Sequence, residues 1–83
     1  LTNQTVLVTG VTGEVGWGLA HAARAAGANL VLPVRSAEQV GALESEFSGA
    51  LVRPVRFTDE ASLTALASEA GGRFGAVHHV FSP

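Results

Sequence analysis

The chain has 83 residues, enough for one small domain, and 47% of them are hydrophobic, which favours a packed globular unit over a disordered one. A formal net charge of -2 gives no general attraction to nucleic acid or anionic membranes, and no apolar run approaches the roughly 20 residues of a membrane span. Cysteine is absent, which excludes disulfides and thiol chemistry and is compatible with a cytoplasmic protein, the location we expect.

The first apolar run leads into a glycine-rich turn. Val6 to Val8 are typical of a strand buried on both faces of a parallel sheet, and Gly10, Gly13 and Gly16 then recur at every third position. In such a strand, turn and helix layout, backbone N–H groups and the positive end of the helix face an anionic ligand. The first glycine permits the tight turn, the second lets backbone approach a pyrophosphate, and the third lets the helix pack closely. The alternative is a tight connection that binds nothing.

A helix is expected from about Val15 to a stop at Gly27. The second strand is expected over Asn29 to Val34, with Pro33 marking where its pairing ends. This second apolar run follows at the distance that a βαβ unit needs, which favours a nucleotide ligand over a bare turn. The apolar face of the helix should consist of positions at helical spacing, namely Val15, Leu19, Ala22 or Ala23, and Ala26.

The second helix carries a capping-box pattern, with Ser36 followed three places later by Gln39, and the chain leaves this helix at Ser48–Gly49. A third strand is expected over Leu51 to Phe57, at the edge of the sheet because Pro54 cannot donate to a ladder. The buried stripe of the second helix should be Ala37, Val40, Leu43 and Phe47.

Thr58 or Asp59 can cap a third helix, which Gly71–Gly72 is expected to close, and Ala76 to Phe81 form a fourth strand. Alternating strands and helices predict an α/β fold: a Rossmann-like, doubly wound parallel sheet in the order 3-2-1-4. The ligand crevice should then lie at the carboxyl ends of strands one and four. The apolar positions of the third helix should be Leu63, Leu66, Ala67 and Ala70.

Thr9 to Gly16, read as TGVTGEVG, resembles the TGxxGxxG fingerprint of extended and atypical short-chain dehydrogenases/reductases. Gly27–Ala28, Val34 to Ser36 and Thr58 to Leu63 are also similar to that family. The resemblance covers essentially the whole chain but implies only the cofactor-binding half of such an enzyme. We therefore expect residues 1–83 to be a single, partial NAD(P)-binding Rossmann domain, cut from a longer protein.

The resemblance implies a set of cofactor-binding residues. The three glycines would form the pyrophosphate turn, Thr9 would fix it through its hydroxyl, and Thr12 would bond a phosphate or the turn itself. Val34 stands where the family has an acid that selects NAD, Arg35 follows it, and Ser36 adds a hydroxyl, so NADP is expected and NAD is less favoured. Arg35 as a solvated residue before a helix is the alternative. Asp59 completes the set, with helix capping as its alternative role.

The sequence departs from the family pattern at Glu14, at Arg56 and after the fourth strand, where Val80 to Pro83 replace the family's small or asparagine-rich exit. Glu14 brings a carboxylate next to the phosphate turn, where it complements the helix dipole but repels pyrophosphate if it points inward. Arg56 stands where the family often has an aspartate that contacts adenine, so that contact is lost or replaced by a stacked guanidinium.

His78 and His79 are adjacent on a predicted strand, so their side chains should point to opposite faces and cannot chelate one metal together. One of them is expected to be buried and hydrogen-bonded. Trp17 is expected to pack a helix or to contact sequence outside this chain, rather than to stack on a cofactor.

The family's catalytic serine, tyrosine and lysine are expected beyond the fourth strand. The chain contains neither tyrosine nor lysine, so these residues alone cannot transfer hydride by that mechanism, and no catalytic residue is predicted here. The function expected is the cofactor-binding portion of an NADP(H)-dependent oxidoreductase. The alternatives are a non-catalytic dinucleotide sensor or interaction module, and a structural unit that binds nothing. An exposed fourth strand predicts a homo-oligomer or another association through that edge.

Overall fold

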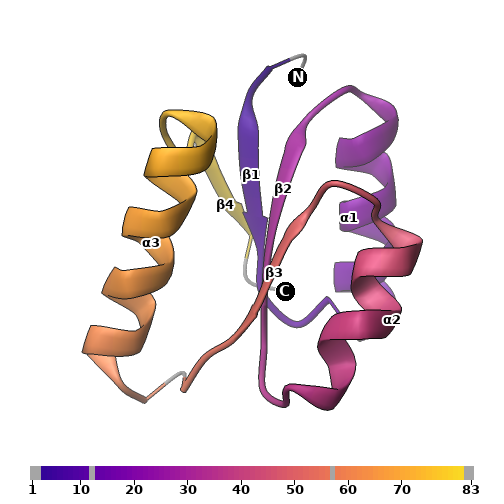
Figure 1. The fold of residues 1–83 in the computed structure, drawn as a ribbon. Coiled ribbons are helices and arrows are strands. Elements are labelled where there is room, and N and C mark those ends of the chain that lie inside the picture. The colour runs from indigo at the N-terminus through magenta and orange to yellow at the C-terminus, as the bar shows by residue number, and fades with distance from the viewer. Residues whose placement is uncertain (1–2, 12, 57, 82–83) are drawn as a thin grey trace.

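The computed structural model describes residues 3–11, 13–56 and 58–81. Within them strands and helices alternate along the chain, as the sequence predicts (Figure 1). Their bounds are β1 Thr5–Val8, α1 Glu14–Ala25, β2 Asn29–Val34, α2 Glu38–Glu46, β3 Leu51–Pro54, α3 Glu60–Phe74 and β4 His79–Phe81.

The four strands form one parallel sheet in the order β3-β2-β1-β4, which confirms the predicted α/β doubly wound topology. Val6 of β1 pairs with Leu30 of β2 on one side and with His79 of β4 on the other. Helices α1 and α2 cover one face of the sheet and α3 covers the other (Figure 1). The winding therefore reverses between β1 and β4, so a crevice at the carboxyl ends of the strands is expected there.

Two apolar cores lie on opposite faces of the sheet. Strand β2 supplies both, because Leu32 packs into the core under α1 and α2 while its neighbour Val31 packs into the core under α3. Both side chains are fully buried, which explains why β2 is continuously apolar rather than alternating. The core under α1 and α2 is the larger of the two and includes Phe47, Leu43 and Ala20.

The buried face of α1 differs from the predicted one. Val15 is 64% exposed and Ala26 is exposed beyond the helix end, whereas Leu19 is only half-buried. The face that meets the sheet is phased one residue later, because its small residues allow the closest approach of helix backbone to the strands. These residues are Gly16, Ala20 and Ala23.

The capping box of α2 forms as predicted. The Ser36 hydroxyl accepts a hydrogen bond from the N–H of Glu38 at 3.2 Å, and the Ser36 N–H donates to Oε1 of Gln39 at 3.2 Å. Leu43 and Phe47 are buried, but Ala37 is exposed and does not belong to the buried stripe, because it precedes the first turn that packs on the sheet.

Trp17 of α1 packs against Phe47 beyond α2, with ring centroids 5.3 Å apart in an edge-to-face arrangement. His21 completes this cluster and lies 3.0 Å from a carboxylate oxygen of Glu46. These contacts confirm that Trp17 packs a helix.

Helix α3 is longer than predicted. It continues through Gly71–Gly72 to Phe74 and stops at Gly75, which has a φ of +93°. Phe74 packs against the core under α3, and Arg73 donates to the carbonyl of Gly49 at 3.0 Å, so tertiary contacts offset the low helix propensity of the two glycines. On the buried face only Leu66 and Ala70 are fully covered, whereas Leu63 is 38% exposed and Ala67 is also exposed.

The strand ends also differ in part from expectation. Strand β3 lies at the edge as predicted, and its ladder with β2 runs through Pro33 to Val34, so Pro33 does not end that pairing. Pairing between β1 and β2, in contrast, stops at Val31. Strand β4 begins at His79 rather than Ala76, because the longer α3 takes up part of the connection. Strand β3 ends at Pro54, so the prediction that it continues is wrong for Val55 and Arg56, whereas Phe57, its predicted last residue, lies outside the described residues.

Candidate nucleotide-binding site

The glycine turn joins β1 to α1 and begins with a left-handed residue. Gly10 has a φ of +63°, a conformation that residues with a Cβ rarely adopt, and its carbonyl accepts a hydrogen bond from the N–H of Gly13 at 3.0 Å. Gly13 is the N-cap of α1 and has no side chain to cap it. The first N–H groups of a helix have no intrahelical acceptor, so this turn presents backbone donors and the positive end of the α1 dipole.

Gly16 is required for a different reason, which is the close contact between α1 and the turn. A Cβ built on Gly16 would lie 2.2 Å from the carbonyl oxygen of Gly10, whereas a Cβ on Gly13 would lie 3.4 Å from the same atom. Gly10 itself has open space around its Cα and needs glycine only for its φ. The structure thus gives the first and third glycines the structural roles that the sequence predicts for them.

Thr9 joins the turn to the fourth strand. Its N–H and its hydroxyl both donate to the carbonyl of Phe81, at 3.0 Å and 3.3 Å. These bonds hold the carboxyl ends of β1 and β4 together at the edge where the winding reverses. Glu14 is exposed in the first turn of α1, where its charge complements the helix dipole. Thr12 lies outside the described residues.

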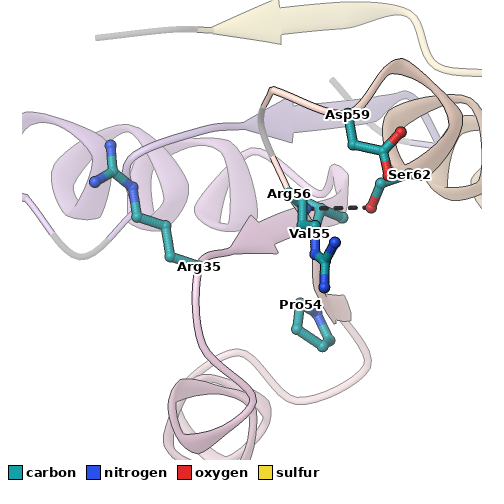
Figure 2. A pocket seen from close by; sticks show the side chains of 6 residues that line it. All are labelled: Arg35, Pro54, Val55, Arg56, Asp59 and Ser62. Carbon is teal, nitrogen blue, oxygen red and sulfur yellow. Dashed lines mark hydrogen bonds between the residues drawn. The ribbon is translucent and has the colours of Figure 1, made fainter.

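A pocket of about 320 Å³ lies beside the carboxyl ends of β2 and β3 (Figure 2). Arg35 reaches it from the end of β2, and Arg56 reaches it from the segment that follows β3. Asp59 and Ser62 line it from the start of α3, while Pro54 and Val55 supply its apolar part.

Hydrogen bonds close the connection from β3 to α3 around this pocket. The N–H of Arg56 donates to the hydroxyl of Ser62 at 3.2 Å, and the carbonyl of Arg56 accepts from the N–H of Asp59 at 2.9 Å. Asp59 also caps α3, because its Oδ1 accepts from the N–H of Ala61 at 3.0 Å. Asp59 therefore both caps the helix and lines the pocket.

The structure brings together only some of the sequence-predicted site residues. Arg35 and Asp59 share the pocket, and the three glycines form the turn. Ser36 does not line the pocket, and its hydroxyl holds the first turn of α2. Ser62 was missed by sequence analysis, and its only signal is its position three residues after the cap residue Asp59.

The two adjacent histidines bind backbone and side chain at the start of the sheet. Nδ1 of His78 accepts from the N–H of Thr5 at 2.9 Å, and Nε2 of His79 lies 2.8 Å from Oε1 of Gln4. Both are hydrogen-bonded, but both are exposed, so the prediction that one is buried is wrong. Within the described ranges, no group of three or more histidine, cysteine or acidic residues could hold a metal ion.

The fold and the turn define a doubly wound, Rossmann-like α/β architecture, and known proteins share it. No protein-family model matches the chain, and no curated protein matches it. Among solved structures, a metagenomic short-chain oxidoreductase in complex with NADP matches with a TM-score of 0.82 and 24% identity over 96% of this chain and 38% of that one.

Two further solved structures also match the fold of this chain. A short-chain dehydrogenase from Streptomyces avermitilis has a TM-score of 0.80 and 27% identity, over 93% of this chain and 29% of that one. A short-chain dehydrogenase/reductase (glucose/ribitol dehydrogenase) from Brucella melitensis has a TM-score of 0.87 and 24% identity, over 96% and 35%. The chain therefore has the fold of short-chain dehydrogenases/reductases and spans about a third of the length of these structures.

Over residues 3–11, 13–56 and 58–81, no helix combines the length and the apolar character needed to cross a membrane.

Proposed function

We propose that the chain is the NADP(H)-binding portion of an oxidoreductase of the short-chain dehydrogenase/reductase type. One observation carries this proposal: the glycine turn and the pocket that contains Arg35 lie at the same edge of one parallel sheet, at the ends of neighbouring strands. A dinucleotide needs both a pyrophosphate site and a separate adenosine site, and strands about 4.8 Å apart place the two within reach of one extended ligand.

The residues of the turn fit a pyrophosphate. The left-handed Gly10 and the close packing of Gly16 bring the start of α1 against β1, so backbone N–H groups can approach an anion without a side chain in between. The relative that was solved with NADP supports the same class of ligand.

Arg35 is the basis for preferring NADP to NAD. Arg35 is exposed and is one of the residues that line the pocket, and a planar guanidinium can bind a phosphate in a bidentate manner. The bound nucleotide would supply or accept a hydride. The chain's own residues bind and orient it, and they include no tyrosine or lysine to act as the proton donor of this family.

Calorimetric titration of the folded chain with NADPH and with NADH tests this proposal. We expect tighter binding of NADPH, and Arg35→Ala should weaken NADPH binding roughly 10- to 100-fold because a charge-assisted contact is lost, with little change for NADH. Arg24→Ala, which removes the same charge in the last turn of α1, is the matched control and should leave both affinities unchanged. Equal losses for the two nucleotides in the Arg35 variant would overturn the NADP assignment.

A second candidate is a non-catalytic dinucleotide sensor or interaction module, favoured by the exposed fourth strand. Val80 and Phe81 are 62% and 40% exposed, and β4 forms one edge of the sheet. This module would associate, with itself or a partner, through that edge, and NADPH would change the association. Sedimentation with and without NADPH tests it, and a nucleotide-independent monomer at high concentration would contradict it.

The cytoplasmic location expected from the sequence stays a prediction.

A further inference from the structure

The five arginines of the chain are used in different ways. Arg53 donates to both carboxylate oxygens of Glu69, with a shortest distance of 2.7 Å, and Arg73 donates to a backbone carbonyl while its guanidinium lies over the ring of Phe74. The side chains of Arg35 and Arg56 have no hydrogen bond or ion pair with any other described residue. Two arginines whose guanidinium groups have no described partner therefore line one pocket.

The backbone of Arg56 is fixed although its side chain is exposed. Its N–H is bonded to Ser62 and its carbonyl to Asp59, so the residue is held at the rim of the pocket by the start of α3. The pocket contains one acid, Asp59, and Oδ1 of that acid is occupied as the cap of α3. The formal charge of the lining residues is thus +1, from two arginines and one aspartate.

We propose that Arg56 is a second phosphate-binding arginine of this pocket, which acts with Arg35 on the 2′-phosphate of NADP(H). This inference rests on the proposed function. A phosphate monoester carries about -1.5 to -2 charges at neutral pH and has three acceptor oxygens, more than a single guanidinium can satisfy. A guanidinium has five N–H donors and no acceptor, so Arg56 matches the phosphate and cannot replace an aspartate as an acceptor for an adenine amino group.

Both arginines are exposed, so their side chains can reorient toward an anion. Figure 2 shows the two arginine side chains leaving the ends of neighbouring strands with their guanidinium groups pointing in different directions. Like charges repel when no anion lies between them. Exposed side chains change rotamer within picoseconds to nanoseconds, so a phosphate can draw both groups inward without moving the backbone.

The test compares NADPH and NADH binding in the wild type, Arg56→Ala, Arg56→Lys and Arg35→Ala, with Arg24→Ala as the control for loss of charge. We expect Arg56→Ala to weaken NADPH binding roughly 10-fold and NADH binding less than about twofold. Arg56→Lys should lie between the wild type and Arg56→Ala, because an ammonium keeps the charge but not the bidentate geometry. Adenosine 2′,5′-bisphosphate should follow NADPH, and adenosine 5′-monophosphate should follow NADH.

Each other outcome overturns the inference. If Arg56→Ala weakens both dinucleotides equally, Arg56 stacks on the base or supports the site in another way. If it changes neither while Arg35→Ala removes the NADPH preference, the proposed function stands and the role of Arg56 is wrong. A folded wild type that binds neither dinucleotide overturns both proposals. Circular dichroism of each variant checks that the exposed substitutions leave the fold intact.

Discussion

The glycine turn and the pocket lined by Arg35 and Arg56 both lie at the carboxyl ends of the strands, but they are built in opposite ways. The turn is made of backbone, with Gly10 in a left-handed conformation and Gly16 in van der Waals contact with it. The pocket is lined mainly by exposed residues and bordered by a hydrogen-bonded connection, and the guanidinium groups of its two arginines have no partner among the described residues. A substitution in the turn should therefore change both the stability of the fold and ligand binding. A substitution of a pocket side chain should change ligand binding with little effect on stability.

The largest effect is expected for Gly16→Ala. The new Cβ would lie 2.2 Å from the carbonyl oxygen of Gly10, so α1 or the turn must shift, at a cost of about 2 kcal/mol or more in the free energy of unfolding. For a domain of this size the melting temperature should fall by roughly 10 °C. Because the turn itself moves, both NADPH and NADH should bind more weakly.

Gly18→Ala is the matched control within the same helix. No atom lies within 4 Å of a Cβ at Gly18, so this substitution should stabilise the chain by up to about 1 kcal/mol through helix propensity. Equal melting temperatures for the two variants would show that the close contact at Gly16 does not exist.

An intermediate effect is expected for Asp59→Ala, which removes the cap of α3 beside the pocket. The bond from Ala61 N–H to Oδ1 is lost, and the free energy of unfolding should fall by about 1 kcal/mol. Thermal unfolding measures the loss. Asp59→Asn keeps a capping oxygen and should retain most of the stability, and an equal loss in both variants would contradict the capping role.

The smallest effect on stability is expected for Arg35→Ala and Arg56→Ala. Neither side chain has a partner within the described part of the chain, so each substitution should change the free energy of unfolding by less than about 0.5 kcal/mol. The same thermal unfolding experiment measures it. A large loss in either variant would mean that the pocket, like the turn, is part of what holds the fold together.

The topology could be predicted because local signals agree along the whole chain. Continuous apolar runs mark buried strands, Gly27 ends the first helix with a φ of +87°, and Ser36 forms its predicted capping box. Pro54 correctly predicted that the third strand lies at the edge of the sheet. The parallel strand order was predicted from the alternation of strands and helices along the chain.

The predictions that were wrong, the buried face of α1 and the end of α3, concern features that depend on tertiary packing rather than on the local sequence pattern. In α1, alanines surround the helix, so hydrophobicity could not set its phase, and the contact at Gly16 decides which face is buried. In α3, Gly71–Gly72 resembled a stop, but the distant contacts of Arg73 and Phe74 extend the helix.

The candidate site could be predicted where local sequence signals mark it, but not where it depends on tertiary contacts. The fingerprint glycines and Arg35 stand out in the sequence, whereas the bond between Arg56 and Ser62 links residues that no motif joins. The shared pocket of Arg35 and Asp59 arises because β2 and β3 are neighbours, and the binding roles of these residues stay predictions.

The two edge strands of the sheet differ in how well they can pair with another strand. At β3 the edge ends in Pro54, which lacks an N–H, whereas β4 offers exposed Val80 and Phe81. A copy that pairs through β4 uses the same edge as its partner, so the contact is isologous and closes after two subunits. In the proposed interaction module, the proline at the opposite edge strand would then work against growth of the joined sheet into a fibre, so the strand order would favour a dimer over a polymer.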